Sequence, residues 1–243
     1  MKILLLAGTT EARALAARLD RDGRIDLTVS LAGATRSPLP LQGNLRTGGF
    51  GSREAQKKFM QGMGFDAVID ATHPFAARIT ERTAEICRSL GLPRLVLLRP
   101  PWQPGPGDDW QEVESAARVG DHVKQDDVVF LATGPGSLDA IGPLDARRIL
   151  CRRIDPTDQP FPWMVGNWLV GRPPFDAGDE IETFREEGVT LLVTKNAGGT
   201  GGEAKLVAAR QLGLPVIMIS RPPPPAGEVV ETLEQAIDWV DRL

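Results

Sequence analysis

Ile3-Leu4-Leu5-Leu6-Ala7-Gly8-Thr9-Thr10-Glu11-Ala12 is the stretch that decides the fold. It joins an apolar run, typical of a buried strand, to a helical pattern across a short polar turn. The same order recurs along the first half of the chain. Further strands are expected at Leu27–Leu31, Ala67–Asp70 and Leu95–Leu98, and helices at Glu11–Leu19, Ser52–Met63 and Ala76–Leu90. Repeated strand-helix units predict an α/β fold whose parallel sheet is covered on both faces.

The second half repeats this alternation of strands and helices, after a segment rich in proline and glycine. Strands are expected at Val128–Ala132, Arg148–Ile154, Thr190–Thr194 and Val216–Ile219, and helices at Asp176–Glu187, Glu203–Leu212 and Val230–Leu243. We therefore predict two similar Rossmann-like domains with parallel sheets and a functional cleft between them. The predicted division is residues 1–100, a Pro/Gly-rich linker and lead-in at 101–125, and a second domain at 126–243. The residues do not show whether the halves keep their own strands or exchange one across the linker.

A short repeat supports this division. Leu90-Gly91-Leu92-Pro93 followed by Arg99-Pro100-Pro101 recurs 122 positions later as Leu212-Gly213-Leu214-Pro215 followed by Arg221-Pro222-Pro223. At that spacing Thr72 aligns with Thr194, His73 with Lys195 and Pro74 with Asn196. Duplication of one ancestral unit explains the match; common helix-stop chemistry, glycine at the end and proline just beyond, is the alternative.

Composition excludes several classes of protein. The 243 residues include two histidines, two cysteines and no tyrosine. This set is too small for a His-rich zinc site or an iron–sulfur cluster, and it excludes reductases whose acid is a phenol. No metal site is expected. The net charge of -4 argues against a nucleic-acid partner, and the apolar runs are too short for a membrane span. We expect a cytoplasmic enzyme, with a monomer as the starting assumption.

Ligands of such sheets bind beyond the carboxyl ends of the strands, so the loops there are the candidate site. In the first loop, Gly8, Thr9, Thr10 and Glu11 lead into a helix whose free amides favour a phosphate. Simple helix capping by a threonine is the alternative. The second strand ends without the acid that usually holds an NAD ribose, and Arg36 follows. This pattern favours NADPH, although Arg36 also suits a solvated loop charge.

Two further loops carry candidates. Thr72 and His73 end a strand, with Arg78 just beyond in the next helix, so His73 is expected to face the crevice. A structural histidine and a capping threonine are the alternatives. Thr133 and Gly134 lie in a third, glycine-containing loop that can approach a phosphate or the edge of a substrate.

The fourth loop has the strongest pattern, Thr194-Lys195-Asn196-Ala197-Gly198-Gly199-Thr200-Gly201-Gly202-Glu203-Ala204-Lys205. Its glycines let backbone amides approach an anion, and its lysines add positive charge. It lacks the Gly-Lys-Ser/Thr ending of a nucleotide-hydrolysing P-loop, which disfavours ATP hydrolysis.

The motifs at 3–12, 70–76 and 194–199, taken together and in this order, resemble the precorrin-6A reductase family of cobalamin biosynthesis. The resemblance spans nearly the whole chain. It implies an oxidoreductase that reduces the precorrin-6A macrocycle, a tetrapyrrole, to precorrin-6B with NADPH. The alternatives are another NAD(P)H-dependent reductase of a carboxylate-rich substrate, including cobalt-precorrin-6A, and a non-catalytic nucleotide-sensing module.

The loops and the resemblance together give each candidate residue a role. Proton donors are sought among His73, Lys195 and Glu203, although water can serve instead. Carboxylates of the substrate are expected to contact His73, Arg78, Lys195, Asn196 and Lys205. The expected cofactor-binding residues are Gly8, Thr9, Thr10, Glu11, Arg36, Thr72, Thr133, Gly134, Gly198, Gly199, Thr200, Gly201 and Gly202.

Overall fold

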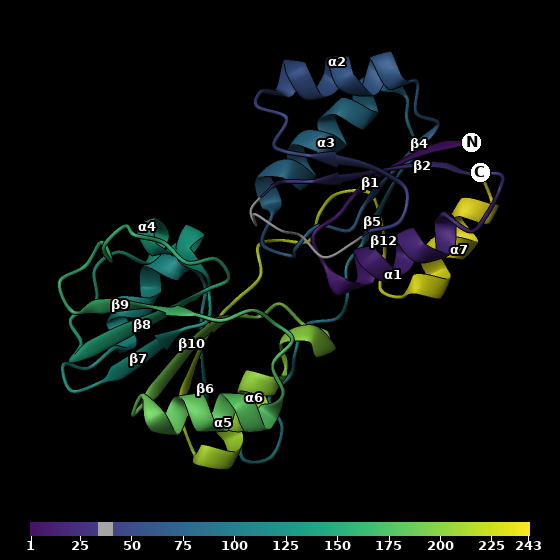
Figure 1. Ribbon diagram of the computed structural model, residues 1–243. Helices are drawn as coiled ribbons and strands as arrows, with labels where there is room; N and C mark the ends of the chain where they lie inside the picture. Colours follow the sequence, from purple (N-terminus) through teal and green to yellow (C-terminus); the bar gives the residue numbers. More distant parts are fainter. Residues whose placement is uncertain (34–40) are drawn as a thin grey trace. The chain divides into compact units, whose positions relative to one another are not determined.

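The chain folds into two compact units, seen in a computed structural model that describes residues 1–33 and 41–243. One unit is Met1–Pro100 together with Pro222–Leu243, and the other is Pro101–Arg221 (Figure 1). Each contains a six-stranded sheet in which all neighbouring strands pair in parallel, flanked by helices. The predicted α/β fold class is confirmed.

The first unit has the strand order β12-β5-β4-β1-β2-β3. Its strands are β1 (Lys2–Leu6), β2 (Asp26–Leu31), β3 (Asn44–Thr47), β4 (Ala67–Asp70), β5 (Arg94–Leu97) and β12 (Glu228–Val230). Its helices are α1 (Thr10–Leu19), α2 (Arg53–Met63), α3 (Ala77–Leu90) and α7 (Leu233–Asp241).

The second unit has the equivalent order β6-β11-β10-β7-β8-β9. Its strands are β6 (Trp110–Val113), β7 (Val128–Leu131), β8 (Arg148–Arg153), β9 (Gly166–Val170), β10 (Leu191–Lys195) and β11 (Val216–Ile219). Its α-helices are α4 (Leu138–Ile141), α5 (Ala177–Glu186) and α6 (Ala204–Leu212), and its 3-10 helices are η1 (Ala116–His122), η2 (Pro135–Ser137) and η3 (Thr200–Gly202).

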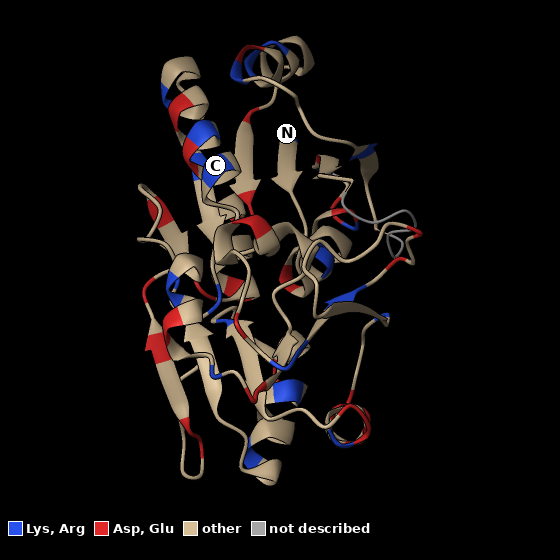
Figure 2. Cartoon of the chain, turned by 90° about the vertical axis from the view of Figure 1, so that its left-hand side faces the viewer, with Lys and Arg blue, Asp and Glu red and all other residues tan. Residues whose placement is uncertain are grey.

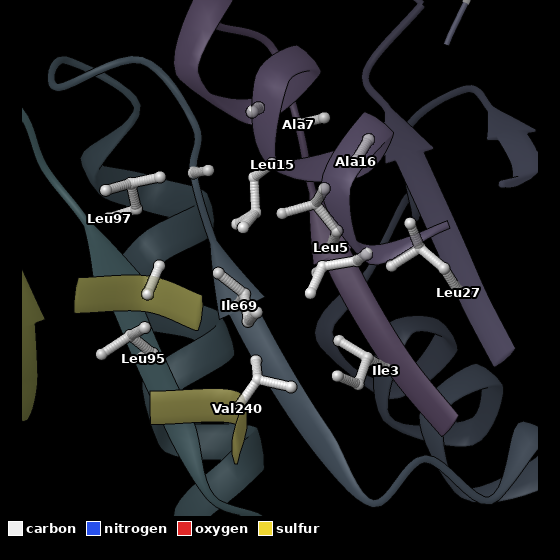
Figure 3. Packing of buried hydrophobic residues seen from close by; sticks show 14 of the residues in the cluster. Ile3, Leu5, Ala7, Leu15, Ala16, Leu27, Ile69, Leu95, Leu97 and Val240 are labelled. Carbon is white, nitrogen blue, oxygen red and sulfur yellow. The ribbon is translucent and has the colours of Figure 1, made fainter. Parts of the chain in front are cut away.

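The first sheet is buried on both faces because alternate side chains of β1 point to opposite sides. Ile3 and Leu5 pack with residues of α1 and α7 in one hydrophobic cluster. Leu4 and Leu6 belong to a second cluster, which includes residues of α2 and α3. Figure 3 shows the first cluster, with Val240 of α7 beside the sheet residues. The continuous apolar run at the start of the chain therefore predicts a central strand correctly.

The two sheets exchange their edge strands. β6 follows β5 in the chain but pairs with β11, whereas β12 follows β11 but pairs with β5. Val113 pairs with Ile219, and Val230 pairs with Leu97. Leu97 lies 122 positions before Ile219, so the two valines occupy equivalent places in the two sheets. Ser115 and Thr232, each two residues beyond its valine, then occupy the N-cap positions of η1 and α7. Each sheet thus takes one strand from the other half of the sequence, which answers the question that the residues left open.

This exchange corrects the predicted domain boundaries. Residues 222–243 belong to the first unit, where Ala236, Trp239 and Val240 are buried in its core. Residues 101–125 are part of the second unit and contain β6 and η1, so they are more than a linker. The prediction was wrong because strand pairing uses backbone groups that every sequence carries, so the residues of an edge strand do not specify which sheet they join.

The repeated Leu-Gly-Leu-Pro motif ends a helix in both halves, α3 in the first and α6 in the second. Gly91 and Gly213 adopt left-handed backbone conformations, with φ of 66° and 64°. The next residues complete matching turns, from the Leu92 amide to the Cys87 carbonyl at 3.0 Å and from the Leu214 amide to the Ala209 carbonyl at 2.9 Å. Shared topology, matching turns and reciprocal strand exchange together favour duplication.

The alignment of the preceding strands needs a shift of two residues. Asp70 pairs with Val96, whereas Thr194 pairs with Met218, 122 positions later. Asp70 is therefore the counterpart of Thr194, and Thr72 is the counterpart of Asn196. The predicted pairing of His73 with Lys195 is wrong for the same reason: the loops between these strands and the repeated helix stops differ in length.

Candidate functional site

Thr9 connects two strand exits of the first unit. Its hydroxyl accepts a hydrogen bond from the Ala12 amide at 3.1 Å and so caps α1. The same hydroxyl donates to the Ala71 carbonyl, just beyond β4, at 2.9 Å. In the described chain, no atom lies within 4 Å of the position that a Cβ on Gly8 would take. The loop is therefore held in place by Thr9 while space beside Gly8 stays open to a ligand.

Glu11 has a partner within the same unit. Its carboxylate accepts a hydrogen bond from Arg99 at 2.6 Å, and both side chains are largely buried. Arg99 belongs to the repeated Arg-Pro-Pro motif, so the first turn of α1 is tied to the segment that follows β5. Sequence reasoning placed Glu11 beside a cofactor, and the structure adds this structural ion pair. Thr10 is the first residue of α1.

The loop after β4 is organised by a buried carboxylate. Asp70 Oδ1 accepts from the Thr72 amide at 3.1 Å and from the Thr72 hydroxyl at 2.7 Å. Asp70 Oδ2 lies 3.8 Å from the buried guanidinium of Arg94. His73 Nδ1 accepts from the Phe75 amide at 3.2 Å, so a neutral imidazole in this position carries its proton on Nε2. The structure thus fixes the orientations of the Thr72 hydroxyl and the His73 ring.

Two other predicted residues of this half are less constrained by the structure. Arg78 is exposed at the second position of α3. α3 has neither an acid in its first turn nor a side-chain cap, so its N-terminal dipole adds to the charge of Arg78. Arg36 lies outside the described residues.

Sequence reasoning missed a glycine-rich loop in the first unit. Gly48, Gly49 and Gly51 follow β3 and lead to Ser52, which caps α2. Arg46 of β3 binds this loop through the carbonyls of Gly48 and Gly49. The glycine pattern was visible in the sequence, but the strand before it was not recognised.

Trp102 and Asn196 hold the strongest predicted loop of the second unit. The Trp102 amide donates to Asn196 Oδ1 at 2.8 Å, and Asn196 Nδ2 donates to the Trp102 carbonyl at 3.0 Å. Trp102 Nε1 also donates to the Gly199 carbonyl at 2.9 Å. Gly198 and Gly199 have φ of 65° and 71°, which other residues rarely adopt. The carboxamide of Asn196, predicted to bind substrate, is therefore already used in an internal contact.

Lys195 ends β10 beside the loop after β7. Its Nζ lies 3.4 Å from the Thr133 carbonyl, and burial lowers the pKa of Lys195 below its ordinary value. The Thr133 hydroxyl is buried and has no hydrogen-bond partner within the described chain. Gly134, at φ 77°, leaves open space where a Cβ would lie. Lys195 and the loop of Thr133 and Gly134, two separate candidates in the sequence, are therefore neighbours in the structure.

Lys205 contacts the same loop from α6. Its Nζ donates to the Gly202 carbonyl and lies 4.9 Å from the centroid of the Trp102 ring. A Cβ on Gly202 would lie 3.0 Å from that Nζ and 3.3 Å from the Trp102 ring, so a larger residue here would push against Lys205 and Trp102. Thr200, Gly201 and Glu203 are exposed. The loop therefore has a fixed inner side and an accessible outer side.

A cavity of about 230 Å³ opens beside this loop, lined by residues from the ends of β7, β8 and β9 and from the start of α6. Arg152, Arg153 and Lys205 contribute positive charge to its lining, and Glu180 contributes a carboxylate. Sequence reasoning missed both arginines because they lie inside a strand pattern and carry no motif. Elsewhere acidic and basic residues are interspersed over both units (Figure 2).

These features define a class: a protein of two Rossmann-like units whose strand-end loops are rich in glycine and cations, as in enzymes that bind a nucleotide and an anionic substrate. The family description "Precorrin-6x reductase CbiJ/CobK" matches residues 2–241, so the chain belongs to that family.

Named relatives agree with this assignment. The chain is 43% identical to "Precorrin-6A reductase" of Rhodococcus erythropolis over 244 aligned positions, which cover 100% of this chain and 98% of the relative. It is 38% identical to "Precorrin-6A reductase" of Rhodobacter capsulatus, with 98% and 95% covered. A solved structure titled "CobK precorrin-6A reductase" superposes with a TM-score of 0.93 at 38% identity, covering 99% of this chain and 96% of that one.

Proposed function

We propose that this chain reduces precorrin-6A to precorrin-6B with NADPH as the hydride donor. The observation that carries the proposal is the full-length match to the family and to relatives named precorrin-6A reductase. The cations at the strand ends support it, because precorrin-6A carries several carboxylate side chains. Arg78 and Lys205 occupy the second positions of α3 and α6, where the helix dipole also favours a carboxylate.

The residues fit a pyridine nucleotide. Open space beside Gly8 and Gly134 allows a phosphate to approach the backbone. The buried Thr133 hydroxyl lacks a partner within the described chain and suits a phosphate or ribose oxygen. Thr9, Thr10, Thr72 and the loop Gly198–Gly202 complete the proposed cofactor contacts. The preference for NADPH over NADH is part of the proposal, with Arg36 as one candidate for the additional phosphate.

The chemistry that NADPH supplies when bound is a hydride. The chain must hold the macrocycle against it, exclude water and let one proton reach the neighbouring atom. His73 carries its proton on Nε2 when neutral, and the Phe75 amide fixes the ring. Lys195 is partly buried, and its lowered pKa makes its ammonium a better acid than an exposed lysine. Lys195 Nζ is therefore the better proton donor of the two, with solvent as the remaining source; the exposed Glu203 is the weakest candidate.

The test is anaerobic mixing of the chain with NADPH and precorrin-6A while the absorbance of both is followed. Loss of NADPH with formation of precorrin-6B supports the proposal. Parallel reactions with cobalt-precorrin-6A and with NADH determine the preferred substrate and cofactor. NADPH that binds but is never oxidised would instead favour the nucleotide-sensing alternative.

Three wider expectations stay predictions: a functional cleft between the units, a cytoplasmic location and a monomeric state. None of the helices in the described part of the chain combines the length and apolar character that a membrane crossing requires.

A further inference from the structure

The guanidinium of Arg152 is built rigidly into the second unit, at the carboxyl end of β8. Its Cζ lies 4.1 Å from the centroid of the Phe175 ring and 4.8 Å from that of Phe130. Its Nη1 donates to Glu180 Oε1 at 2.6 Å. Glu180 is only 3% exposed, and a charged side chain buried this deeply needs a partner, which here is Arg152. Aromatic stacking and the ion pair together fix the plane of the guanidinium.

Two atoms of this ion pair are left without a partner. Arg152 Nε and Glu180 Oε2 are both buried and form no hydrogen bond within the described chain. Nε belongs to the edge of the guanidinium that it shares with Nη2, not to the edge that faces Glu180 through Nη1. Such an edge matches the two oxygens of a carboxylate or phosphate. Both residues line the cavity of about 230 Å³, so a ligand there can supply the missing partners.

The other residues around this cavity favour a negative ligand. Arg153 and Lys205 add two positive charges, and Glu180 is the one acid among the described residues that line it. Gly201, Gly202 and Ala204 bring the start of α6 to the wall. This helix has no acid in its first turn and no side-chain cap, and its N-cap residue, Glu203, is exposed and is not part of the lining. The Glu180 charge is balanced by Arg152, which leaves the lining with an excess of positive charge.

We propose that this cavity is an oxyanion-binding subsite in which Arg152 is the principal binding residue and Glu180 positions it. The bound group presents oxygens to Arg152 Nε and to Lys205, and a hydrogen-bond donor such as a hydroxyl to Glu180 Oε2. The identity of the ligand rests on the proposed function, which supplies two candidates for the bound oxyanion: a phosphate of NADPH and a carboxylate side chain of the tetrapyrrole. Both use the same chemistry at Arg152.

The test variant is Arg152→Gln combined with Glu180→Gln. A single substitution at either position would leave one buried charge unpaired and can prevent folding. The double variant removes both charges and retains a hydrogen-bonding pair. The matched control is Arg148→Gln combined with Glu187→Gln, because Arg148 and Glu187 also form an ion pair at 2.6 Å. Arg148 starts the same strand and is not among the residues that line the subsite.

Dissociation constants for NADPH and NADH, and KM for precorrin-6A, are measured for the wild type and both double variants. We expect at least one value to rise about tenfold or more in the Arg152/Glu180 variant and to stay within about twofold in the control. A rise for NADPH alone assigns the subsite to its additional phosphate, and a rise for both nucleotides to the pyrophosphate. A rise in KM alone assigns it to a substrate carboxylate.

Inorganic pyrophosphate provides a probe that does not depend on the proposed function. It should raise the Tm of the wild type and of the control more than that of the Arg152/Glu180 variant. If the wild type does not oxidise NADPH but this difference is present, the proposed function fails and the subsite stands. If a folded Arg152/Glu180 variant matches the control in every titration, the subsite is wrong.

Discussion

Replacing Asn196 with alanine tests whether this residue stabilises the fold through Trp102 or binds substrate directly. Asn196 and Trp102 are both largely buried, and the Asn196 carboxamide satisfies the amide and the carbonyl of Trp102. An unsatisfied buried group costs ~1–3 kcal/mol, so losing both bonds should lower the free energy of unfolding by about 2–6 kcal/mol. Because Trp102 also binds the Gly199 carbonyl, ligand affinity should fall as well, as a consequence of a loosened loop.

Denaturant unfolding followed by tryptophan fluorescence is a suitable assay. Four of the five tryptophans lie in the second unit, so the signal reports mainly on the unit that contains Asn196. Asn167→Ala is the control, because Asn167 is exposed in the same unit and its loss should change the free energy by less than ~0.5 kcal/mol. Unchanged stability of Asn196→Ala, together with a large rise in KM for precorrin-6A, would refute the internal role and restore the prediction of direct substrate binding.

Further predictions concern the same loop. Lys195→Ala should weaken binding of the ligand whose anion contacts Nζ by ~1.5–3 kcal/mol, and titrations at low and high salt should show a smaller loss at high salt. Burial lowers the pKa of Lys195, so the unfolded chain keeps this proton to higher pH than the folded chain. The free energy of unfolding should therefore rise with pH between the lowered pKa and 10.5, and this contribution should be missing in Lys195→Met. Gly201→Val should impair turnover with little change in Tm, whereas Gly199→Val should also lower Tm because Gly199 has a left-handed backbone.

The central strands of both sheets could be predicted from the sequence, but the four edge strands could not. β1, β4, β7 and β10 are apolar runs because they are buried on both faces, which gives a clear signal. β3, β6, β9 and β12 are the edges, and most of their residues are exposed or only partly buried, so none of them forms the continuous buried apolar run of a central strand. The exchange of β6 and β12 was invisible for the same reason.

The candidate site was predictable where glycines and polar residues follow a central strand. The loop after β10 was recognised because it follows a buried strand, whereas the contact between Lys195 and Thr133 became visible only in the structure. The partners of these residues were not predictable, because Trp102 contacts Asn196 across 94 positions of sequence. Arg152 was missed because its role depends on Glu180 and two aromatic rings that only the folded chain brings together.

The most direct test of the central claim uses NADPH that carries deuterium at the transferable position of its nicotinamide. The chain is incubated anaerobically with this cofactor and precorrin-6A, and the product is examined by mass spectrometry and NMR. The proposed function predicts that precorrin-6B carries one deuterium at a single ring carbon, and that the accompanying proton comes from a group that exchanges with solvent, such as Lys195 Nζ. A reduced product without deuterium, or no reduced product although NADPH is bound, would contradict it.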